Sequence, residues 1–220
     1  MRSELVSRFE AIQREVLTRF ERTAALENHW LIYTLLGWQH LATCGASHFL
    51  LEVKQLQHPV WPYLVLWGTQ ILVALGTIKL VSGRPRVSES PIEPMNKRIW
   101  TMFLLLAINV CILNVAAGQP IFAFMPTLAT LSAFAFTCMT TLISRRFMAA
   151  GLTMVLTGIT MARLPHYQFL IYGAGWWMIL QALGLVLWNR RRHILLSWSC
   201  SSHRRIVQDY ELAGSALVVV

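Results

Sequence analysis

The sequence predicts an all-α, polytopic integral membrane protein, in which a bundle of six transmembrane helices follows an amphipathic N-terminal helix and both chain ends lie in the cytoplasm. Three observations predict this fold class. Hydrophobic residues make up 55% of the 220 positions and charged residues only 13%, whereas a typical soluble domain is roughly a quarter charged. The apolar residues gather in long runs. Most lysines and arginines flank these runs on one predicted side of the membrane.

The first 28 residues differ in pattern from the rest of the chain. Their apolar side chains recur every three or four positions, which places them on one helical face; they are Leu5, Phe9, Ile12, Val16 and Phe20. Acidic and basic residues alternate over the other positions and fall within pairing distance along a helix. Residues 1–28 are therefore predicted to form an amphipathic helix on the cytoplasmic membrane surface or against a partner.

Residues 29–189 form the predicted transmembrane domain. A helix crosses the hydrocarbon core of a bilayer with about 20 apolar residues. Six runs approach this length, and the fifth is the shortest: His29–Leu50, Trp61–Val81, Ile99–Ala117, Pro120–Ile143, Phe147–Ala162 and Tyr167–Trp188. Tight turns at residues 117–120 and 163–166 predict that the third and fourth runs, and the fifth and sixth, form helical hairpins.

The distribution of basic residues predicts the orientation, because lysine and arginine near membrane ends are retained on the cytoplasmic side. With the N-terminus inside, only Lys54 and Arg163 of the 19 basic residues lie outside. Segment 82–98, which contains three prolines, is then a cytoplasmic loop, and residues 190–220 are a cytoplasmic tail. We expect a multi-pass protein of the cell inner (cytoplasmic) membrane.

Several functional classes are disfavoured by what the sequence lacks. The net charge of +9 comes from clusters beside apolar runs, so nucleic acid is not a predicted partner. The four cysteines fall singly, which predicts neither a disulfide framework nor a cysteine zinc site. All ten acidic residues lie outside the runs, whereas ion-coupled carriers usually keep a carboxylate at membrane depth. No hydrolase, metalloprotease or phosphate-loop motif is present, and no motif indicates a cofactor.

Small residues recur every four positions in the fourth and fifth runs, a spacing that lets two helix backbones approach closely. The stripes are Ala129, Ala133, Thr137 and Thr141 in the fourth run, and Ala149, Thr153 and Thr157 in the fifth, beside Gly158 and Ala162. They predict that these two helices pack together. Pro126, in the second turn of the fourth run, predicts a kink because proline removes a backbone donor.

The polar side chains that are candidates for a function at membrane depth are His40, Gln70, Asn109, Asn114 and Gln181. Leaving an amide unpaired in hydrocarbon is costly, so the first interpretation is hydrogen bonding between helices. The alternative is a permease in which the same residues line a path for a neutral or anionic solute. Breaks at Pro126 and at the Gly173/Gly175 pair would then form its gate.

The predicted topology places a second group of residues together on the outer side of the membrane. They are His48, Glu52, His58 and His166. Imidazoles and a carboxylate are the ligands that zinc or copper accepts, which makes the group a candidate metal site. The alternative is that Glu52 pairs with Lys54 or Arg163 and the histidines only occupy the interface.

These observations favour a non-catalytic integral membrane protein, a subunit or scaffold that packs against other membrane proteins. Motifs for chemistry are absent, while small-residue and aromatic surfaces are plentiful. The expected partners are membrane lipids and other integral membrane proteins. The permease is the main alternative, and a membrane enzyme with the outer metal site is the second.

Overall fold

The computed structural model describes residues 11, 28–54, 60–82, 92–120, 123–142, 144–145 and 147–216. Side chains are described for these residues except 82, 92–96, 142 and 197–216. Apart from residues 11 and 28, the predicted amphipathic helix at 1–28 therefore lies outside the described residues, as does His58.

The described residues form six α-helices and one short 3₁₀ helix, with no strand among them. The elements are α2 (His29–Glu52), α3 (Trp61–Ser82), α4 (Ile92–Ala116), α5 (Met125–Leu142), α6 (Phe147–Arg163), η1 (Pro165–Tyr167) and α7 (Gln168–Ala216). The predicted all-α class is confirmed for the described part of the chain.

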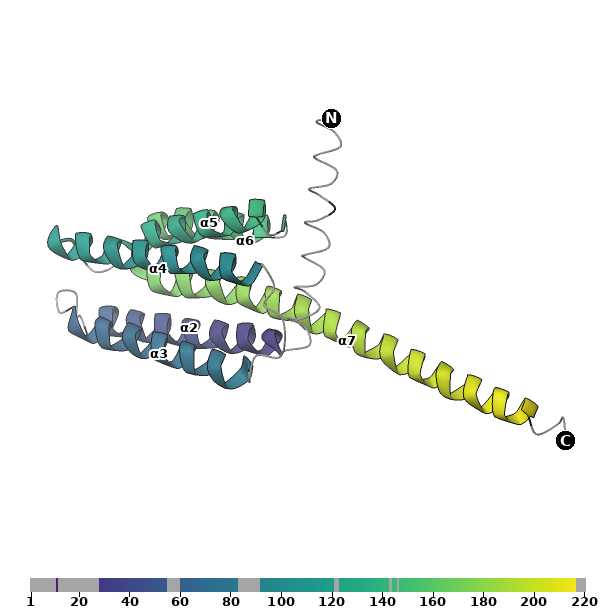
Figure 1. Cartoon of the computed structure of the whole chain (residues 1–220). Coiled ribbons are helices and arrows are strands. Elements are labelled where there is room, and N and C mark those ends of the chain that lie inside the picture. Colours follow the sequence, from purple (N-terminus) through teal and green to yellow (C-terminus); the bar gives the residue numbers. More distant parts are fainter. Residues whose placement is uncertain are drawn as a thin grey trace, which may run out of the picture.

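The helices are arranged around α7. Helix α2 packs along α7 on one side, and α3 packs against α2. On the other side, α6 and part of α5 contact α7, and α4 packs against α5 (Figure 1). Helices α3 and α4 therefore form the outer members of two groups that share α7.

Three described helical segments are long and apolar enough to cross a membrane: Trp61–Val81, Lys97–Ala116 and Pro165–Leu196. Segment Phe147–Arg163 is a shorter apolar helix. These lengths and compositions support a membrane protein in general.

The bounds of three helices agree closely with the apolar runs. Helices α2 and α3 start at the predicted residues, His29 and Trp61, and α6 starts at Phe147. Each ends within two residues of the predicted position. In these segments the polar residues that end the run also end the helix.

The structure shows that parts of the predicted loop at 82–98 and of the predicted tail at 190–220 are helical. Helix α4 begins at Ile92 and so includes residues 92–98 of that loop. Pro94 is compatible with this helix because it lies in the first turn, where a backbone N–H has no hydrogen-bond partner within the helix. Helix α7 runs for 49 residues to Ala216, a length of about 74 Å at 1.5 Å per residue. Figure 1 shows its last part extending beyond the other helices. Arginines 190–192 end the apolar run but do not break a helix, and the sequence has no proline after Pro165.

Helix α5 begins at Met125, five residues after the predicted start. Pro126 is thus the second residue of the helix and not part of its second turn. A proline in the first turn loses no intrahelical hydrogen bond, so the predicted kink is wrong. In the turn that ends α4, Gly118 takes a φ of +66°. In the same turn the backbone N–H of Gln119 donates to the backbone carbonyl of Asn114 at 3.1 Å.

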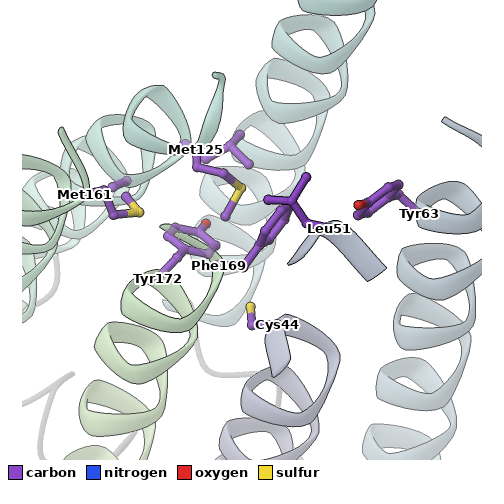
Figure 2. Close-up of a cluster of buried hydrophobic side chains, with 9 residues drawn as sticks. Cys44, Leu51, Tyr63, Met125, Met161, Phe169 and Tyr172 are labelled. Atoms are coloured by element: carbon purple, nitrogen blue, oxygen red, sulfur yellow. The ribbon is translucent and has the colours of Figure 1, made fainter. Parts of the chain in front are cut away.

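One buried apolar cluster ties five helices together near one end of the bundle. Figure 2 shows its larger members, among them Cys44 and Leu51 from α2, Tyr63 from α3 and Met125 from α5. Met161 from α6 and Phe169 and Tyr172 from α7 complete the labelled set. A second cluster, around Phe136, Met154 and Ile179, joins α5, α6 and α7.

The predicted packing of the fourth and fifth runs is confirmed in the contact of α5 with α6. A Cβ added to Gly158 would lie 3.5 Å from Cβ of Ala129, and one added to Gly151 would lie 3.5 Å from the carbonyl of Ala133. The α6 side of the contact differs from the predicted stripe, because Ala149 is exposed. Glycines seven residues apart make the close approach on α6.

Glycines also set the separation of α2 and α7. A Cβ at Gly173 would lie 2.6 Å from Cβ of Cys44, and a Cβ at Gly184 would lie 2.9 Å from the hydroxyl of Thr34. Gly173 and Gly184 are three helical turns apart, so they share a face of α7. The helix is unbroken at Gly173 and Gly175, so the helix break expected in the permease interpretation is wrong.

Candidate functional site

A polar cluster lies between α2 and α3 among the described residues. The amide nitrogen of Gln70 lies 2.7 Å from Nδ1 of His40. When Nδ1 accepts this bond, the imidazole proton is on Nε2, which faces Sγ of Cys44 at 3.7 Å. The side chain of Gln39 donates to the backbone carbonyl of Gln70 at 2.6 Å. The expectation that His40 bonds a neighbouring helix is confirmed.

Aromatic rings enclose the imidazole. The centroids of Trp67, Tyr172 and Trp176 lie 5.7, 5.5 and 5.8 Å from that of His40, all with steeply inclined planes. Trp67 comes from α3 and the other two from α7, so three helices form the enclosure. The imidazole is thus surrounded by three aromatic rings, the amide of Gln70 and the thiol of Cys44.

Two further hydrogen bonds extend the cluster. The indole of Trp67 donates to the hydroxyl of Ser47 at 3.2 Å. The hydroxyls of Ser132 and Tyr172 lie 3.2 Å apart, which connects α5 to α7. The side-chain amide oxygen Oε1 of Gln70 is buried without a partner among the described groups. Hydrogen bonds and ring contacts thus join α2, α3, α5 and α7 at one place.

Gln181 lies apart from this cluster. Its amide donates to the backbone carbonyl of Thr34 at 3.1 Å and so joins α7 to α2. The same nitrogen is 2.7 Å from where a Cβ on Gly37 would be, which shows how closely the glutamine fits against α2. Hydrogen bonding between helices is therefore the role of both Gln70 and Gln181.

The two predicted pathway residues of α4, Asn109 and Asn114, are placed differently. The side chain of Asn114 donates to the carbonyl of Pro120 at 3.2 Å, within the turn that follows the helix. Asn109 is exposed. Of the five residues proposed for a pathway, the structure brings together only His40 and Gln70; the other three make separate contacts or face outward.

The outer group is brought together in part. Nδ1 of His166 lies 3.6 Å from a carboxylate oxygen of Glu52. The ring of His48 lies 5.9 Å from that of Tyr167, and Nδ1 of His48 is buried without a partner among the described groups. Within the described ranges, no three His, Cys, Asp or Glu side chains lie close enough to hold a metal ion. His58, the fourth predicted ligand, is outside those ranges.

A shallow apolar groove of about 230 Å³ runs between α4 and α5. Met102, Phe103 and Leu106 line one wall, Phe134 and Cys138 line the other, and Arg98 lies among the lining residues. None of the predicted polar or metal-binding residues lines this groove.

Sequence reasoning missed the aromatic residues around His40. Trp67, Tyr172 and Trp176 lie within runs rich in aromatic residues, where a ring near a membrane end suggests an interfacial anchor. The spacing of Trp176 and Tyr172 by four residues indicated a shared helical face. That this face meets His40 depends on how α7 packs against α2.

No family model, no curated protein and no solved structure matches the chain.

Proposed function

We propose that the chain is a non-catalytic, multi-pass membrane protein that acts as a subunit or scaffold by packing against other integral membrane proteins. It is proposed to cross the cell inner membrane six times, with both chain ends in the cytoplasm and with the predicted metal and pathway residues in packing roles.

One observation carries the proposal: α4 is exposed along its membrane-length stretch yet has an amide on its surface. The most apolar 18-residue stretch of this helix contains no buried residue. Asn109, near the middle of the stretch, is exposed. Lipid tails cover apolar side chains but offer no hydrogen bond to an amide. A protein partner supplies both.

Helix α3 supports the same proposal. Its most apolar stretch likewise contains no buried residue, and large side chains such as Leu72 and Leu80 are 71% and 84% exposed. Several polar groups inside the bundle, in contrast, hydrogen-bond neighbouring helices, as His40 with Gln70 illustrates. Hydrogen bonds therefore join helices inside the bundle, while the most apolar stretches of the outer helices α3 and α4 contain no buried residue.

Labelling tests the proposed topology. Single cysteines at Pro59, Pro91, Gln119 and the C-terminus are tested for access to an impermeant reagent in intact cells. We expect labelling from outside at Pro59 and Gln119 only. Outside labelling at Pro91, or protection of Pro59, would overturn the six-span arrangement.

Purification in mild detergent tests the proposed role. A subunit or scaffold brings another membrane protein in a fixed ratio. A clean monomer with transport activity overturns the proposal in favour of the permease. Bound zinc or copper in stoichiometric amount, lost in His48→Ala and His166→Ala, overturns it in favour of the enzyme with an outer metal site.

A further inference from the structure

The two faces of α4 differ in burial. The partly buried residues turn toward the bundle. Five of them recur with the spacing three, four, three, four, namely Trp100, Phe103, Ala107, Val110 and Asn114, and the other two, Ile99 and Cys111, are neighbours of this stripe. The stripe displaced by two residues has the same spacing and is exposed at every position; it is Met102, Leu105, Asn109, Ile112 and Ala116. Two residues correspond to about 200° around a helix. The exposed stripe therefore lies opposite the face that packs inward.

The spacing of the exposed stripe is the heptad spacing of a helix that pairs with another helix. Leu105 and Ile112 are 57% and 60% exposed, so they offer apolar knobs on both sides of the amide. Met102 is 62% exposed and also borders the groove between α4 and α5. Ala116, at one end, lets a second backbone come close. The candidate span covers Lys97–Ala116. The stripe begins five residues after the start of this span and ends at its last residue, Ala116.

Asn109 needs a partner that the rest of the described chain does not supply. The other amides within the six predicted apolar runs each donate a hydrogen bond; they are those of Gln39, Gln70, Asn114, Gln168 and Gln181. The amide of Asn109 is exposed near the centre of a candidate span of 20 residues. An amide at that depth is costly unless another polar group meets it.

We infer that the exposed stripe of α4 pairs with the same stripe of a second copy of this chain, with the two Asn109 amides bonded to each other. The inference rests on the proposed function and names one partner for it. An asparagine side chain both donates and accepts, so two copies satisfy each other. A two-fold axis along the membrane normal places both amides at the same depth. A single asparagine in a heptad seam also fixes the register of the pair.

The experiment measures self-association of the full chain in lipid vesicles. Donor and acceptor fluorophores are attached at the N-terminus, and energy transfer is followed as lipid dilutes the protein. We expect wild-type protein to associate and Asn109→Leu to raise the dissociation constant about 3-fold to 30-fold, the effect of one interhelical polar contact in a membrane. Asn109→Gln keeps an amide and restores association.

Asn114→Leu is the matched control. It is the same substitution on the same helix but on the face turned inward, so the dissociation constant stays at the wild-type value. Equal association of Asn109→Leu and wild type overturns the inference. So does a wild-type chain that shows no more energy transfer than an unrelated membrane protein at every dilution.

Cross-linking tests the geometry independently. In a chain whose four native cysteines are replaced, Ile112→Cys is expected to form a disulfide between copies and Leu104→Cys is not. Leu104 is exposed but lies about 140° around α4 from Asn109. Equal cross-linking at the two positions overturns the inference.

The outcomes also separate this inference from the proposed function. A chain that co-purifies with another membrane protein but does not self-associate overturns the second-copy inference alone. A chain that self-associates through α4 and has transport activity without other subunits overturns the proposed function alone.

Discussion

Gly173→Ala is expected to destabilise the bundle by about 1–3 kcal/mol, the cost of forcing an extra methyl group into a packed contact. The new Cβ would lie 2.6 Å from Cβ of Cys44 and 3.2 Å from its Sγ. Carbon atoms in contact normally lie about 3.5–4.0 Å apart. Helices α2 and α7 must therefore separate by about 1 Å at this point, and the contact cannot relax by a rotamer change because both atoms are Cβ.

Gly68→Ala is the matched control, because a Cβ at this helical glycine of α3 would meet nothing within 4 Å. Alanine is the better helix former by about 0.5–1 kcal/mol, so this change is expected to stabilise the protein slightly. The two substitutions are chemically identical and are predicted to have opposite signs.

Equilibrium unfolding in mixed micelles, with an increasing share of denaturing detergent and tryptophan fluorescence as the signal, measures both changes. A second substitution locates the cause. Cys44→Gly removes the opposing Cβ and should recover much of the loss in the Gly173→Ala background, whereas Cys44→Ala keeps that Cβ and should recover little. If Gly173→Ala proves as stable as wild type, or if Cys44→Gly brings no recovery, the close approach of α2 to α7 is refuted.

Three other predictions use the same unfolding measurement. Gln70→Leu leaves Nδ1 of His40 without its donor and should cost about 1–3 kcal/mol; an unchanged stability would show that the bond contributes nothing. Gly37→Ala should cost less than Gly173→Ala, because its methyl meets the mobile end of a glutamine, and a larger cost would contradict this. Asn28 has a φ of +60° and accepts a hydrogen bond from Arg191. Both Asn28→Ala and Asn28→Gly remove this hydrogen bond, but only glycine tolerates the positive φ. Asn28→Ala should therefore lower the stability by about 1–2 kcal/mol more than Asn28→Gly. Equal losses of stability would show that the hydrogen bond alone, and not the φ, causes them.

The helix bounds show what hydrophobicity along the chain predicts well and what it misses. Runs flanked by polar residues located α2, α3 and α6 closely, because the same residues ended both the run and the helix. The runs did not locate the start of α4 or the end of α7. Residues 92–98 and those after Trp188 are polar enough to end a run but remain helical, because Pro94 lies in the first turn of α4 and no proline follows Trp188.

The candidate site was predictable in kind but not in detail. Polarity at membrane depth singled out His40, Gln70 and Gln181, and the cost of an unpaired amide predicted that each meets another helix. Asn109 looked the same in the sequence, yet it faces outward. The direction of a polar side chain depends on the rotation of its helix within the bundle, and apolar residues on every side of α4 leave that rotation undetermined.

The sequence by itself determined that the chain is helical and apolar enough for a membrane, because run length and hydrogen-bond satisfaction in hydrocarbon depend only on local composition. Only the tertiary structure decided that Gly173 and Gly184 meet α2, that aromatic rings enclose His40, and that α7 lies between two groups of helices. These are contacts between distant segments. They depend on the shapes of two helix faces fitting together, which the periodicity of one helix does not specify.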